Sequence, residues 1–262
     1  MNLYRRELRE GRRGLLGWAI GVAAAVLLYM PFYPSVGGPE LTQTYIDMFP
    51  PELAALFALE GLASGPGYAQ STYFGLLGFL LISIAAIGWG SRAVAGAEDS
   101  GTLELTLAHA VTRWQVVLET ALALLTRVAA LCVVGSVLVW ALNGPAQLGI
   151  EPTRLLAVTL ALFLLTSVTG LAALFGGAVS GRPAVATGLG ALVAVAAYVL
   201  DAVARLAGAP WLARLSPYHW AYGSDPITAG FDLGGAAALA AAMAALVLLS
   251  GWRFSRRDVG TA

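Results

Sequence analysis

The sequence predicts an all-α, polytopic membrane protein that crosses the bilayer six times. Of its 262 residues, 58% are hydrophobic and only 11% are charged, and the mean hydropathy is +0.77. A soluble domain carries about 25% charged residues, so this chain has too few to cover a globular surface. Lipid is therefore the natural solvent for most of the chain.

Six stretches are long and apolar enough to be membrane helices, for which about 20 residues are needed. Only helices and closed barrels satisfy their backbone in lipid, and these runs are too evenly apolar for the alternating strands of a barrel. We therefore expect one transmembrane domain over residues 1–262. The predicted spans are approximately residues 14–33, 73–95, 114–142, 155–179, 183–204 and 234–252.

The arginines predict the orientation of these spans, because cytoplasmic loops are enriched in basic residues. With the N-terminus inside, eleven arginines fall on the cytoplasmic side and one, Arg127, lies within the third span. Only Arg154, Arg205 and Arg214 fall outside. An even number of spans then places both termini in the cytoplasm.

Short amphipathic helices are expected outside the spans. Residues 1–13 predict a helix on the cytoplasmic membrane surface with its arginines at the headgroups, although a plain positive-inside anchor is an alternative. In the outer loop of residues 34–72, Pro51 suits a helix start, and the apolar spacing after it suits one buried face. The outer loop of residues 206–233 is rich in aromatic residues, which favours interfacial anchoring over ligand binding.

Composition excludes several kinds of chemistry. All fifteen basic residues are arginines, so the chain lacks the lysine of a P-loop or of a Schiff-base enzyme. The single cysteine, Cys132, and two histidines cannot build a tetrahedral metal site. Neither histidine has a catalytic set of residues near it in sequence. We expect a non-catalytic chain with no metal site and no cofactor of its own, so any ATP that drives it binds to another chain.

The most polar internal segment follows the second span, at residues 97–114. Thr102, or Ser100 before it, suits a helix cap, and acidic residues suit a helix N-terminus. Leucines in this segment are expected to leave apolar surface facing the cytoplasm, where such surface usually meets a partner. The acidic residues are Glu98, Asp99 and Glu104, and the leucines are Leu103, Leu105 and Leu107.

This segment resembles the signature of type-2 ABC export permeases, although Ala110 stands where that family usually has proline. A second resemblance precedes the last span and matches the corresponding segment of the same family. The first set of matching residues is Glu98, Asp99, Gly101, Thr102, Leu103, Glu104, Ala108, Val111, Thr112 and Arg113. The second is Ser216, Pro217, Tyr218, Tyr222, Asp225, Pro226 and Gly230.

The resemblance implies a membrane subunit that forms a dimer, here a homodimer with twelve spans, and binds two ATPase subunits. Residues 98–114, including Leu107, would form the coupling helix that docks on the ATPase, and the N-terminal segment would brace that contact. ATP and Mg would bind to the partner, and no nucleic acid is expected. Family members export hydrophobic or amphipathic compounds such as drugs, peptides or lipids from the plasma (cytoplasmic) membrane of bacteria or archaea.

Charged residues near the membrane interior form a second candidate site. An arginine at a span centre costs about 2.5–3.5 kcal/mol, so Arg127 should face water or an acidic partner. Glu119 precedes it on the same span, and Asp201 lies near the outer end of the fifth span. We expect Arg127 either to line the transport pathway or to form an ion pair across helices, and a purely structural ion pair is the alternative.

Other functions stay open at the level of sequence. A substrate-binding membrane subunit of a vitamin importer also has six spans, but it would lack the acidic, leucine-rich segment. An ABC complex with a sensing or envelope role and no net export is a further alternative. A membrane-embedded enzyme fits poorly because no predicted span carries a histidine or paired acids.

Overall fold

The computed structural model describes residues 3–36, 62–103 and 111–257, and all regular structure within these ranges is helical. The elements, in chain order, are α1 (Leu3–Glu10), α2 (Arg12–Tyr29), η1 (Met30–Phe32), α3 (Tyr33–Val36), α6 (Gly65–Ala69), η3 (Gln70–Gly78), α7 (Phe79–Ser91), η4 (Arg92–Gly96), α8 (Ala97–Asp99), α10 (Arg113–Leu142), α11 (Pro152–Ser180), α12 (Pro183–Ala207), α13 (Pro210–Ala213), α14 (Pro217–Tyr222) and α15 (Leu233–Arg256).

Six continuous helices among the described residues are long and apolar enough to cross a membrane, which confirms the predicted architecture. The second begins at Gly65, earlier than the expected start near residue 73, because Ser64 caps the helix by accepting from the N–H of Gly67 at 3.2 Å and Pro66 lies in its first turn. The six run over Arg12–Ser35, Gly65–Asp99, Arg113–Leu142, Pro152–Ser180, Pro183–Ala207 and Leu233–Arg256.

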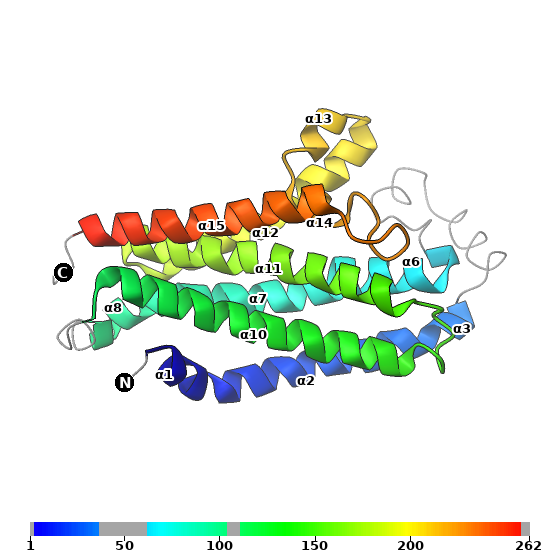
Figure 1. The fold of residues 1–262 in the computed structure, drawn as a ribbon, viewed down its shortest axis with the longest axis horizontal. Coiled ribbons are helices and arrows are strands. Elements are labelled where there is room, and N and C mark those ends of the chain that lie inside the picture. The colour runs from blue at the N-terminus through cyan, green and yellow to red at the C-terminus, as the bar shows by residue number, and fades with distance from the viewer. Residues whose placement is uncertain (1–2, 37–61, 104–110, 258–262) are drawn as a thin grey trace.

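The helix α11 forms the centre of the bundle, where it packs against α7, α12, α15 and α10 (Figure 1). In the most apolar window of α11, 67% of residues are buried, and the second span has the same share. The corresponding share is only 17% in α2, α12 and α15. These three helices therefore present apolar faces outward, as helices bordered by lipid or by another membrane chain do.

Close backbone contact joins α7 to α11. A Cβ atom added at Gly90 would lie 2.1 Å from the carbonyl oxygen of Gly170. A Cβ atom at Gly170 would in turn lie 2.9 Å from the Cβ of Ala86. Small residues that let two backbones meet are the usual means of packing helices in membranes, where no hydrophobic effect drives helices together.

The second span is not a regular α-helix. Two π-helical segments, η3 and η4, lie on either side of α7. Such segments are rare and often mark functional positions in helices. Here η3 lies toward the end of the bundle that carries α3 and α6, and η4 leads directly into α8 and the polar segment.

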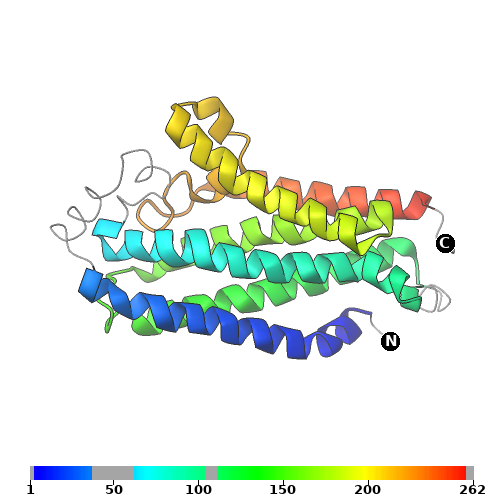
Figure 2. The same ribbon diagram turned by 180° about the vertical axis from the view of Figure 1, so that it is seen from behind.

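Both termini lie at one end of the bundle, which we call the terminal end (Figures 1 and 2). The helices α1 and α8, the start of α10 and the last turn of α15 gather at this end. The helices α3 and α6 lie at the opposite end, which we call the distal end. The predicted short helix after Pro51 lies outside the described residues.

Candidate functional site

The polar segment between the second and third spans, residues 98–114, is called here the coupling segment, and its described residues, 98–103 and 111–114, lie at the terminal end. Its described part begins in α8, where Glu98 and Asp99 close the second span. Gly101 follows with a φ of +69°, a conformation that suits glycine because it has no Cβ. The predicted residues Glu104 and Leu107 lie outside the described part of the chain.

Leu103 does not present apolar surface, and this part of the sequence prediction is wrong. Its side chain is 1% exposed. The chain turns at Gly101, whose N–H donates to the carbonyl of Glu98 at 2.9 Å, and Leu103 then packs in an apolar cluster at the terminal end. Other members of this cluster are Leu3, Val94, Val117, Leu174 and Phe254.

The hydroxyl groups of Ser100 and Thr102 cap the C-terminal end of α8. Both donate to the carbonyl of Ala97, at 3.3 Å and 3.1 Å, and they lie 3.0 Å from each other. Carbonyl groups at a helix end lack partners within the helix, so these bonds stabilise the end of the second span. Thr102 and Leu103 are themselves helical, so Thr102 also lies at the start of a following helix, where the sequence predicts a cap.

Both ends of the coupling segment are attached to the last turn of α15. Glu98 forms an ion pair with Arg257 on one side. On the other side, Arg113 donates to the carbonyl of Phe254 at 2.9 Å and to that of Arg257, and its guanidinium lies 5.6 Å from the centre of the Phe254 ring. A force that displaces this segment would therefore act on the last span as well as on the second and third spans.

A capping box fixes the start of α10. The Thr112 hydroxyl accepts from the backbone N–H of Gln115 at 3.2 Å, and the Gln115 side chain accepts from the N–H of Thr112 at 2.9 Å. Val111, just before, packs against the apolar cluster of the terminal end. The Thr-x-x-Gln spacing is a recognised helix-start signal that the sequence analysis did not use.

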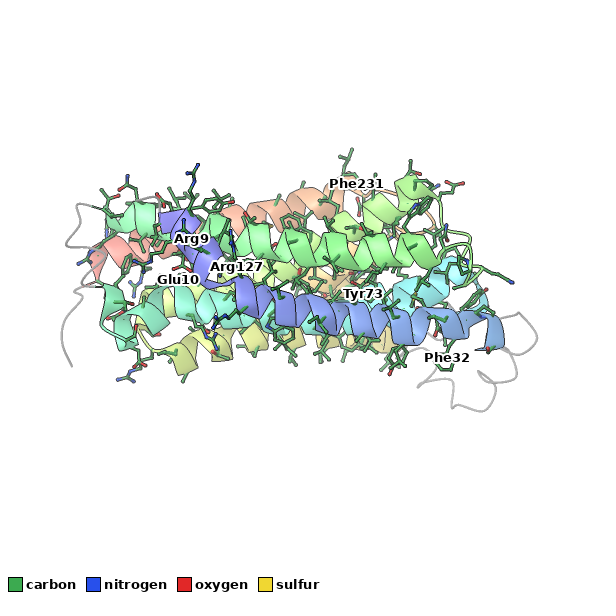
Figure 3. The ribbon with its side chains drawn as sticks, turned by 90° about the horizontal axis from the view of Figure 1, so that it is seen from below. Arg9, Glu10, Phe32, Tyr73, Arg127 and Phe231 are labelled. Carbon is green, nitrogen blue, oxygen red and sulfur yellow. The ribbon has the colours of Figure 1, made fainter. Side chains whose placement is uncertain are left out.

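Arg127 lies against the N-terminal helix. Its Nη2 is 3.5 Å from a carboxylate oxygen of Glu7 and also donates to the Glu7 carbonyl. The guanidinium lies 5.7 Å from the ring centre of Trp89. Neither Glu119 nor Asp201 is its partner among the described residues. Figure 3 shows Arg127 beneath α1, close to Glu10.

Arg127 lies at the middle of the third span, at the fifteenth of the 30 residues of α10. A Cβ atom at Gly11 would lie 2.5 Å from its guanidinium, so Arg127 lies level with the start of α2. The reason is that α10 begins farther toward the terminal end than α2 does.

Glu119 and Asp201 have separate partners. Glu119 accepts from the backbone N–H of Tyr4 at 2.8 Å, and the Tyr4 hydroxyl lies 3.1 Å from that of Thr126, so α1 is docked along α10. Asp201 is 2% exposed and forms an ion pair with Arg205. Its other carboxylate oxygen lies 3.0 Å from Nδ1 of His219.

The outer-loop motif packs against the π-helical segment η3. Ser216 caps α14, since its hydroxyl accepts from the N–H of His219 at 3.2 Å and donates to the Ala197 carbonyl at 2.5 Å. Pro217 occupies the first turn of α14, a position that proline favours. Pro226 is buried in the loop that follows, where its carbonyl accepts from the N–H of Gly230 at 3.1 Å.

Two tyrosines of α14 make the direct contacts with η3. The hydroxyl of Tyr218 donates to the carbonyl of Gly75, and that of Tyr222 donates to the carbonyl of Phe74, both at 2.9 Å. Burial raises the pKa of both hydroxyls above the ordinary tyrosine value, which keeps them protonated as donors. We call this pair of bonds the tyrosine clamp.

Replacing Tyr222 or Tyr218 with phenylalanine should lower the free energy of unfolding by about 1–2 kcal/mol each, because a buried carbonyl loses its donor. The measurement is the unfolding midpoint of the purified chain in detergent. Tyr198→Phe is the matched control, since Tyr198 contacts the Tyr218 ring but its hydroxyl has no hydrogen bond among the described residues. Equal effects in all three variants would contradict the role given to the clamp.

Together, the fold and the site define a polytopic membrane protein in which a polar segment joins the second and third of six described spans and is attached at both ends to the last one, at the end that carries both termini. The profile of the family described as ABC-2 family transporter protein matches residues 1–259, so the chain belongs to this family. It is thus the membrane component of an ABC transporter, as its resemblance to type-2 ABC permeases predicted. A comparison with curated proteins finds no match.

Proposed function

We propose that this chain is the transmembrane subunit of an ATP-driven exporter, and that two copies form the translocation pathway. Separate ATPase subunits, which bind ATP and Mg, would dock on the coupling segment. The terminal end would face the cytoplasm of a bacterium or archaeon, in agreement with the arginines that gather there. Family membership supports this proposal over a vitamin-capture subunit, whereas a sensing or envelope role remains the second proposal.

The attachment of the coupling segment to α15 is the observation that carries this proposal. Glu98 and Arg113 hold its two ends on the last turn of α15. A motor protein that pushes the segment would move the second, third and sixth spans together, which is what switching a pathway between two sides requires. The N-terminal helix α1, docked on α10, would brace the same region.

The apolar faces that α2, α12 and α15 present outward support dimerisation, because few of their residues are buried within one chain. Large apolar side chains such as Leu192 and Val195 are more than half exposed on α12. A second copy that covers part of these faces would line the pathway with apolar residues. Such a pathway suits a hydrophobic or amphipathic substrate, for which drugs, peptides and lipid-like compounds are the candidates.

Charge reversal at the Glu98–Arg257 pair should uncouple the ATPase. We expect Glu98→Arg or Arg257→Glu to reduce ATPase stimulation several-fold in nanodiscs that contain the chain and its co-expressed ATPase, and the double swap to recover most of it. Arg182→Gln is the control, because Arg182 is exposed at the same end and forms no ion pair within the described residues. Unfolding midpoints of all variants separate uncoupling from loss of fold.

A second variant tests docking itself. Residues 102–112 would be replaced by a glycine–serine linker of the same length, and the yield of co-purified ATPase would be measured. The docking proposal predicts loss of the complex. If the ATPase assembles equally well with this variant, the coupling segment is not its docking site.

A further inference from the structure

A cavity of about 750 Å³ lies at the terminal end, between α1, the start of α2, the end of the second span and α10. This volume lies within the range of about 300–1,000 Å³ typical of ligand sites. The charged residues around it come from three segments far apart in the sequence. They are Arg6, Glu7, Glu10, Arg92 and Arg127.

The cavity has one positive charge more than its own acidic residues neutralise. Glu7 pairs with Arg127, and Glu10 pairs with Arg6 at 3.4 Å. Arg92 lines the same cavity, is exposed, and has no ion-pair partner within residues 3–36, 62–103 and 111–257. Three arginines thus meet two glutamates, and Arg92 is left available for an anion.

An unsatisfied donor in the cavity wall also indicates an acceptor. Arg127 is only 6% exposed, and its Nε has no hydrogen-bond partner among the described residues. A buried donor without an acceptor costs about 1–3 kcal/mol. Gly11 covers this Nε, since a Cβ atom there would lie 2.7 Å from it, and the open space lies next to Gly14, where a Cβ atom would lie no closer than 3.9 Å to its nearest neighbour, Nε1 of Trp89.

We propose that this cavity binds a phosphate group, with Arg92 as its main ligand and Arg127 as a second donor. Guanidinium groups match phosphate because their planar N–H pairs meet two oxygens at once. The phosphate belongs either to an anionic lipid headgroup at the membrane surface or to a free phosphate ion. Glu10 and Glu7 hold Arg6 and Arg127 in place and neutralise two of the three arginine charges. A single bound anion then balances the charge of Arg92.

The test compares the wild type with Arg92→Gln and with the control Arg182→Gln, which alters an arginine that is exposed like Arg92 but does not line the cavity. Each protein is placed in nanodiscs of phosphatidylcholine, with or without phosphatidylglycerol, and retained lipid is counted by native mass spectrometry. In a second arm, inorganic phosphate is titrated in detergent against chloride at equal ionic strength, and the unfolding midpoint is followed. We expect Arg92→Gln to weaken binding about tenfold, as loss of one charge-assisted hydrogen bond does.

The two arms identify the source of the phosphate. Selective retention of phosphatidylglycerol without an effect of inorganic phosphate indicates a lipid headgroup, and stabilisation by inorganic phosphate indicates the free ion. Gly14→Leu, which fills the cavity without changing its charge, should weaken binding as well and serves if Arg92→Gln folds poorly. Binding that is equal in the wild type, Arg92→Gln and Gly14→Leu would overturn the proposal.

Discussion

Replacing Arg127 with alanine should release α1 from the third span and lower the free energy of unfolding by about 2–4 kcal/mol. The side chain of Arg127 is 7% exposed and that of Glu7 is 25% exposed, so the substitution leaves a largely buried carboxylate without its partner. The Glu7 carbonyl loses its donor at the same time. Unfolding midpoints in detergent measure the loss of stability, and trypsin cleavage at the arginines of α1 measures its release.

Arg154→Ala is the control for Arg127→Ala. Arg154 pairs with Glu151 at 3.9 Å, but their side chains are 34% and 73% exposed, and such surface pairs contribute about 0–1 kcal/mol. The Arg154 variant should therefore stay close to the wild type in both measurements. If Arg127→Ala keeps wild-type stability, protease resistance and transport, the residue has neither a structural role nor a role in the pathway.

Replacing Gly90 with valine should lower the free energy of unfolding by about 3 kcal/mol, at the upper end of typical overpacking effects. The new side chain would meet the backbone of α11 at Gly170, which cannot move aside as a flexible side chain does. Because α11 is the centre of the bundle, its displacement would disturb the contacts of α12 and α15 as well. The measurement is again the unfolding midpoint, together with the yield of monodisperse protein.

Gly88→Val provides a closely matched control. Gly88 lies in the same helix, and a Cβ atom there would meet nothing within 4 Å. Changes in helix propensity are therefore the same in both variants, and only the contact with α11 differs. Similar losses of stability in the two variants would show that close packing of α7 and α11 is not what holds this region together.

The sequence predicts the six spans well because length and apolar composition are local properties. The start of the second span was placed too late, since the sequence does not reveal that helical structure extends back through η3 to Gly65. The burial of Leu103 was missed for a related reason. Its environment depends on Leu3 and Phe254, which lie near the two ends of the chain.

The partners of the charged residues were equally hard to predict. Arg127 finds Glu7 in the N-terminal helix, and Glu98 finds Arg257 near the C-terminus. Both pairs join residues more than a hundred positions apart, so no spacing in the sequence indicates them. Local signals exist for the capping box at Thr112 and for the Asp201–Arg205 pair, whose members are four residues apart on one helix.

The tyrosine clamp has a consequence for how the second span moves. A π turn holds one residue more than an α turn, so moving it along the helix rotates the residues that it passes by about 100°. Tyr218 and Tyr222 hold two carbonyls of η3 in fixed positions. Such a shift would require both hydrogen bonds from α14 to break, so the clamp opposes rotation of the second span at the distal end.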